Sequence, residues 1–79
     1  MYIHLGNDFL ILCKELIAIL NIEQGLTPDA KEIIEVAELD KKLIDISREG
    51  KRKSMVICGD YVYLSPISSA TLYKRAVNY

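Results

Sequence analysis

The chain has 79 residues, of which 51% are hydrophobic and 27% are charged, and its formal net charge is −1. This length fits a single domain, residues 1–79, and a domain this small buries only a modest core. The high apolar content therefore suggests that other copies of the chain cover part of its surface. The most apolar stretch, residues 9–20, is interrupted by Lys14 and Glu15 and is too short to span a bilayer.

The charges are distributed unevenly along the chain. Residues 1–50 contain ten acids and five bases, whereas residues 51–79 contain one acid and five bases. This asymmetry suggests a surface that faces a polyanion on a mildly acidic body, but charge alone favours the simpler interpretation of an acidic solvated helix with scattered bases. The first residues lack the basic and then apolar segments of a secretory signal, so we expect a cytoplasmic protein.

The N-terminal part of the chain is predicted to form strands. Residues 2–5 and 9–13 are apolar runs of strand length, and the turn-forming Gly6-Asn7-Asp8 lies between them, so we expect a hairpin. Residues 16–22 form a third apolar run. Periodicity does not separate a strand from a buried helix there, and the isoleucine content favours a strand.

A helix is predicted over residues 28–39. Thr27 is a suitable N-cap, Pro28 suits the first helical position, and Asp29 complements the helix dipole. Apolar residues recur within the segment at helical spacing, and acids occupy most of the other positions. Residues 43–46 then form a short predicted strand.

A second hairpin is predicted in the C-terminal half. Residues 54–58 and 61–64 are rich in strand-forming residues and are joined by Gly59-Asp60. Pro66 ends the second strand, and Ser68 or Ser69 caps a final helix. The order of elements predicts an α+β fold with a small, mostly antiparallel sheet and a central and a C-terminal helix. We expect the two hairpins to contribute to one antiparallel sheet.

The sequence contains no clear catalytic or metal-binding pattern. His4 lies in a predicted strand with no local nucleophile or orienting carboxylate, so we interpret it as structural. Cys13 and Cys58 lack metal-ligand spacing and are expected to be buried thiols. The four glycines form no phosphate-binding loop. We therefore expect no enzyme activity, metal, cofactor or small-molecule substrate.

Three consecutive bases, Lys51-Arg52-Lys53, precede the second hairpin. One interpretation is a solubilising turn between strands. The other is a phosphate-binding turn, because arginine presents a planar fork to phosphate oxygens and lysine adds a point charge. One such turn would bind weakly, so useful affinity would require its repetition across an oligomer.

Two segments resemble a known family: residues 1–9, MYIHLGNDF, and residues 63–76, YLSPISSATLYKRA. They are similar to the RemA/RemB-like extracellular matrix regulatory proteins, a small bacterial family widespread in Firmicutes. The resemblance covers nearly the whole chain, and residues 23–49 match only in type. It implies a LytTR-like fold and a DNA-binding regulator of matrix operons that assembles into rings with basic residues facing DNA.

The resemblance also implies site residues. The family's basic pair falls on Lys51 and Arg52, beside Lys53, and a further basic residue falls on Lys14. Lysine stands at positions 14 and 51, where relatives typically carry arginine, so the charge is kept and the bidentate fork is lost. The first hypothesis is thus a cytoplasmic, ring-forming regulator of matrix, biofilm or related genes that binds double-stranded DNA. The second is a homo-oligomeric protein-interaction module without DNA affinity, which the apolar content and the acidic predicted helix favour.

Overall fold

The computed structural model describes residues 1–77, apart from the side chain of Glu49. The elements in chain order are β1 (Tyr2–Gly6), β2 (Phe9–Leu12), the 3₁₀ turn η1 (Cys13–Glu15), β3 (Leu16–Asn21), α1 (Pro28–Leu39), β4 (Leu43–Asp45), the 3₁₀ turn η2 (Arg48–Gly50), β5 (Ser54–Cys58), β6 (Val62–Ser65) and α2 (Ser69–Val77). Each predicted strand and helix is present, including the strand at residues 16–21 that periodicity left open. The predicted α+β class is confirmed.

Four of the strands form one sheet in the order β3-β5-β6-β4. β3 pairs antiparallel with β5, and β5 pairs antiparallel with β6 across the Gly59-Asp60 turn, where Cys58 N donates to Tyr61 O at 2.9 Å. β4 pairs with β6 in parallel, because the loop after β4 crosses the end of the sheet before β5 begins. The sheet is therefore mostly antiparallel, and β3 and β4 form its two edges.

The expectation that both hairpins share one sheet is wrong. β1 and β2 form a separate two-stranded sheet, and η1 redirects the chain between β2 and β3. The hairpin instead buries one face, with Ile3, Leu5 and Ile11, in the core that it shares with the larger sheet and α2. The apolar pattern requires only that this face of the hairpin be covered. Either arrangement can cover it, so the pattern alone did not distinguish a shared sheet from a separate one.

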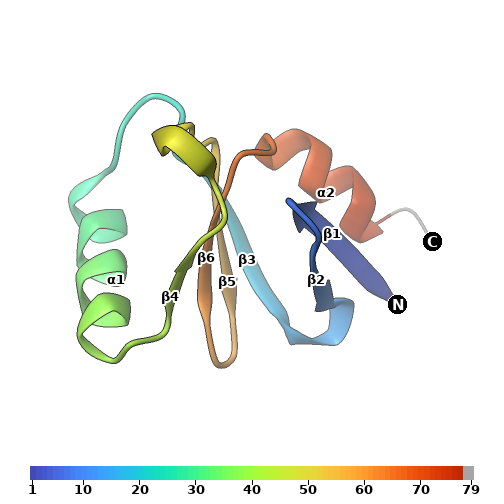
Figure 1. Ribbon diagram of the computed structural model, residues 1–79, viewed down its shortest axis with the longest axis horizontal. Coiled ribbons are helices and arrows are strands. Elements are labelled where there is room, and N and C mark those ends of the chain that lie inside the picture. Colours follow the sequence, from blue (N-terminus) through green and yellow to red (C-terminus); the bar gives the residue numbers. More distant parts are fainter. Residues whose placement is uncertain (78–79) are drawn as a thin grey trace.

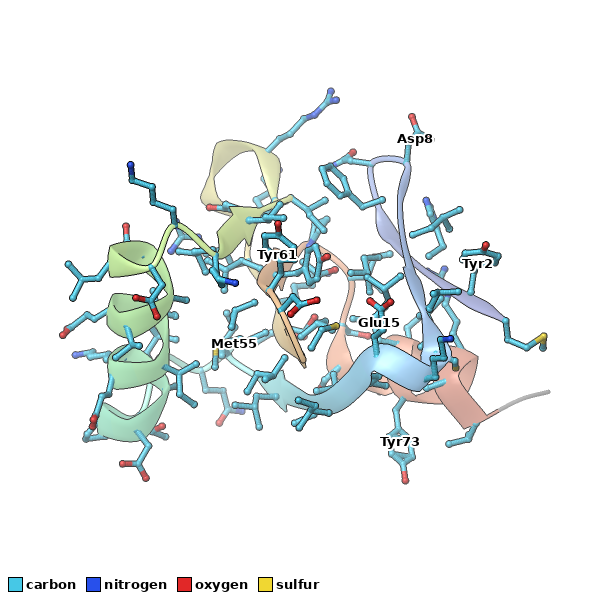
Figure 2. The ribbon with its side chains drawn as sticks, turned by 90° about the horizontal axis from the view of Figure 1, so that it is seen from below. Tyr2, Asp8, Glu15, Met55, Tyr61 and Tyr73 are labelled. Carbon is cyan, nitrogen blue, oxygen red and sulfur yellow. The ribbon has the colours of Figure 1, made fainter. Side chains whose placement is uncertain are left out.

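The larger sheet lies between two layers (Figure 1). α1 lies on one side of it, while α2 and the β1–β2 hairpin lie on the other. β5 alternates between the two sides, since Val56 and Cys58 belong to the core under α2 and Met55 to the core under α1. Figure 2 shows Met55 between the sheet and α1.

Local capping explains where the helices begin. Thr27 Oγ1 accepts a hydrogen bond from Ala30 N at 3.1 Å and Pro28 opens α1, as predicted. At α2, Ser68 Oγ accepts from Thr71 N at 3.3 Å, so the helix is capped by Ser68 rather than by Ser69. Within residues 1–77, neither helix is long and apolar enough to cross a membrane.

Candidate nucleic-acid interface

The basic residues lie in the loop that joins β4 to β5. We call residues 48–53 the basic loop; its bases are Arg48, Lys51, Arg52 and Lys53, and Glu49 is its one acid. All four basic residues are exposed. The loop is compact, because Lys51 N donates to Arg48 O at 3.4 Å and Arg52 N donates to Gly50 O at 2.9 Å.

Both ends of the basic loop are fixed to the sheet. Before the loop, Ile46 N donates to Leu64 O at 2.8 Å, and the side-chain amide of Asn7 in the first hairpin donates to Ile46 O at 2.8 Å. At its last residue, Lys53 N donates to Ser65 O at 2.9 Å and Lys53 O accepts from Ile22 N at 3.1 Å. The loop therefore presents its charges from anchored ends rather than from a long free segment.

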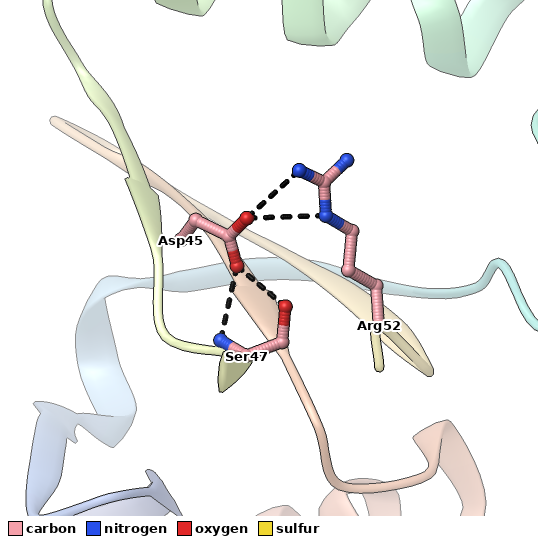
Figure 3. A network of polar contacts seen from close by, with 3 residues as sticks. All are labelled: Asp45, Ser47 and Arg52. Atoms are coloured by element: carbon pink, nitrogen blue, oxygen red, sulfur yellow. Dashed lines mark hydrogen bonds and ion pairs between the residues drawn. The ribbon is translucent and has the colours of Figure 1, made fainter. Parts of the chain in front are cut away.

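Arg52 makes the most specific contacts in the loop (Figure 3). Its Nη2 lies 2.8 Å from Asp45 Oδ2, and its Nε donates to the same oxygen at 3.1 Å. The other oxygen, Asp45 Oδ1, accepts hydrogen bonds from the backbone N–H of Ser47, at 3.0 Å, and from its hydroxyl. Arg52 thus closes the loop back onto the end of β4.

Lys14 does not join this cluster within one chain. It is exposed in η1, next to Leu16, which pairs with Cys58 at the far end of β5. The basic loop instead lies next to Ser54, which pairs with Asn21 at the other end of β3. Lys14 and the basic loop therefore lie at opposite ends of the larger sheet. For both to contact the same DNA molecule, the duplex must run along the length of the sheet or the two contacts must come from different subunits.

The acidic residues are concentrated on another layer. The exposed acids of α1 are Asp29, Glu32, Glu35 and Glu38. α1 covers one face of the larger sheet, whereas the basic loop lies at one end of the sheet, next to Ser54 of β5 (Figure 1). The charge asymmetry of the sequence is thus also a separation in space.

The remaining candidates for chemistry occupy structural positions. His4 lies on the exposed side of β1, and its backbone carbonyl accepts a hydrogen bond from Arg75 Nη1 at 2.9 Å. Cys58 is buried as predicted, whereas Cys13 is only half-buried. Burial raises the pKa of the Cys58 thiol, and the nearby Glu15 carboxylate raises it further. Among the described side chains, no group of three or more His, Cys, Asp or Glu residues could hold a metal ion.

Two residues of this site were missed in the sequence. Arg48 could have been included, since it lies only three residues before Lys51. Asp45 could not, because its contact with Arg52 depends on how the chain turns between β4 and β5.

Comparison with known proteins places the chain in a family. Residues 2–76 match the RemA-like family, described as extracellular matrix regulatory protein A-like. The chain is also 36% identical to extracellular matrix regulatory protein B of Bacillus subtilis (strain 168) over 76 residues, which cover 96% of this chain and 90% of that protein. Because both matches span almost the whole sequence, the chain belongs to the RemA-like family.

Proposed function

We propose that this protein is a DNA-binding transcriptional regulator of extracellular matrix, biofilm or related genes, which acts in the cytoplasm as a homo-oligomeric ring. The observation that carries the proposal is the anchored, exposed basic loop at one end of the larger sheet. The relative from Bacillus subtilis is named a matrix regulatory protein, and that name supports the regulatory role.

The chemistry of the loop suits a phosphate backbone better than base edges. Lysine side chains at positions 51 and 53 supply mobile point charges, and the guanidinium of Arg52 supplies directed donors. Such contacts hold a protein on duplex DNA without reading its sequence. They release counterions, so the affinity should fall steeply as salt is added.

A single loop offers few phosphate contacts, and oligomerisation would multiply them. In a closed ring every subunit presents its loop on the same rim, and each further contact becomes intramolecular once the first has formed. The proposal therefore requires surfaces through which one chain binds the next.

The structure has exposed apolar side chains at opposite sides of the larger sheet. At the β3 edge, an apolar groove is lined by Leu16 and Ile17 of β3 and by Tyr73, Ala76 and Val77 of α2; Ile17 is 68% exposed, and Figure 2 shows Tyr73 pointing away from the body. On the other face of the sheet from α2, α1 exposes Val36 and Leu39, the latter by 83%. Two different patches on opposite sides support a head-to-tail interface, which closes into a ring when the rotation between subunits allows it.

The alternative is a homo-oligomeric protein-interaction module that does not bind DNA. The observation that favours it is a hollow between α1 and the β5–β6 turn in which acids outnumber bases; its charged and aromatic lining residues are Asp29, Glu32, Asp40, Lys42, Asp60 and Tyr61. Such a surface suits a basic protein segment and would repel DNA.

Fluorescence anisotropy of a labelled DNA duplex, with sedimentation of the free protein, distinguishes the two functions. We expect a species several times heavier than the 9.0 kDa chain and DNA binding that weakens with salt. An oligomer without DNA affinity at low salt would favour the interaction module. A 9.0 kDa monomer at micromolar concentration would contradict both.

A further inference from the structure

The ion pair between Asp45 and Arg52 joins the two ends of the connection between β4 and β5. Asp45 is the last residue of β4, and Arg52 lies two residues before β5 begins. The pair is partly exposed, with 45% of the Arg52 side chain and 34% of the Asp45 side chain accessible. An exposed ion pair of this kind contributes little to the free energy of folding, so stability alone does not explain its specific geometry.

The carboxylate of Asp45 is held in one orientation before it meets Arg52. Ser47 donates two hydrogen bonds, from its backbone N–H and from its hydroxyl, to Oδ1, in the turn geometry typical of aspartate. Ser47 itself is buried, and its N–H also donates to Leu64 O at 3.2 Å. The remaining oxygen, Oδ2, therefore faces Arg52 from a fixed position.

Asp45 uses only one side of the guanidinium (Figure 3). The contacts run from Nε and Nη2 to Oδ2, which occupies the side edge of the planar group. The end of the group, with Nη1 and the second hydrogen of Nη2, is not engaged by Asp45, and its two parallel N–H donors can form a two-pronged contact with phosphate oxygens.

We propose that Asp45 is a positioning residue for DNA binding: it holds the Arg52 guanidinium so that its outer edge is presented to a DNA phosphate. This inference rests on the proposed function. The negative charge of Asp45 by itself would weaken the binding of a polyanion. The proposed role has the opposite effect, because it favours DNA binding.

The two opposing effects differ in size. Removing a carboxylate about 7 Å from a phosphate would strengthen binding by less than about threefold in water, and salt screening reduces this gain. Leaving a long arginine side chain to be ordered only on binding weakens affinity by about two- to tenfold. We therefore expect the loss of positioning to exceed the relief of repulsion.

The test is a double-mutant cycle on the whole protein, with duplex DNA affinity as the readout. Asp45→Asn retains an oxygen for Ser47 and places no charge beside Arg52. We expect it to weaken DNA binding about two- to fivefold, although it makes the chain more positive. In the Arg52→Ala background the same change should have no weakening effect, because nothing remains to be positioned. Glu35→Gln, an exposed change on α1 with the same charge difference, is the matched control and should not weaken binding.

The outcomes separate this inference from the function on which it rests. Unchanged or tighter binding by Asp45→Asn would overturn the positioning role, as would an equal weakening in the Arg52→Ala background, which would point to a general effect on the loop. If the parent protein binds no DNA at low salt, the proposed function fails and the inference fails with it. Circular dichroism checks that each variant is folded. If Asp45→Asn unfolds, Ser47→Ala replaces it in the cycle. The inference then requires that Ser47→Ala weaken DNA binding by a smaller factor and that this weakening vanish in the Arg52→Ala background.

Discussion

Ser65 offers the sharpest test of how the fold holds α2 and the first hairpin together. Its hydroxyl donates to Leu5 O at 2.6 Å and accepts from Ile67 N at 3.0 Å, and Ser65 and Leu5 are 0% and 1% exposed. One side chain thus connects the end of β6 to β1 and to the segment that leads into α2. Ser65→Ala removes both hydrogen bonds while changing the side-chain volume little.

The loss of stability expected for Ser65→Ala follows from the burial of the backbone groups that lose their hydrogen-bond partner. A buried backbone group without a partner costs about 1–3 kcal/mol. Ser65→Ala leaves the buried acceptor Leu5 O and the part-buried donor Ile67 N without this partner. Allowing for partial relaxation, we expect the free energy of unfolding to fall by about 2–4 kcal/mol, which is a large part of the stability of a small domain. Ser68→Ala, which removes only the α2 cap, should cost about 1 kcal/mol.

Urea denaturation followed by circular dichroism measures this difference at one fixed protein concentration, since association adds to the apparent stability. The midpoint should fall with an unchanged slope for Ser65→Ala and should fall less for Ser68→Ala. A decrease below about 0.5 kcal/mol for Ser65→Ala, the range of ordinary surface changes, would refute the reasoning.

Three further predictions concern packing, assembly and pH. Gly6→Ala should destabilise the protein more than Gly25→Ala in the same urea assay, because both glycines have positive φ but only a Cβ at position 6 would lie 3.1 Å from Pro66 Cγ. Ile17→Lys should lower the sedimenting mass without unfolding the chain, because this side chain is 68% exposed on the edge strand β3. The free energy of unfolding should fall as the pH rises above 9.0, the ordinary pKa of cysteine. Burial raises the pKa of Cys58 in the folded state, so the thiol of the unfolded chain ionises first and the unfolded state is favoured. Cys58→Ala should reduce this fall.

Local chemistry made most of the secondary structure predictable. The cap at Thr27, the turn at Gly59-Asp60 and the stop at Pro66 each act within a few residues, so they give the same signal in the sequence and in the fold. The predicted strand ends differ from the observed ones by about one residue, as at β6, which begins at Val62 rather than at residue 61.

Long-range pairing was not predictable in the same way. The apolar pattern of β1 and β2 is the same whether the hairpin joins the sheet or packs against it, and the 3₁₀ turn at residues 13–15 decides between the two. Likewise, the family resemblance groups Lys14 with Lys51, while the antiparallel pairing of β3 with β5 puts them at opposite ends of the sheet. The contact of Asp45 with Arg52 depends on the same tertiary geometry.

The most direct test of the proposed function is the salt dependence of DNA binding in the Lys51→Ala/Lys53→Ala variant, which leaves the pair between Asp45 and Arg52 in place. The slope of log affinity against log salt should become shallower by about 0.9 for each phosphate that the variant no longer neutralises, uniformly across DNA sequences. Lys31→Ala, on the exposed surface of α1, should leave the slope unchanged. A folded Lys51→Ala/Lys53→Ala variant with the slope of the parent protein would contradict the assignment of the basic loop as the DNA-binding surface.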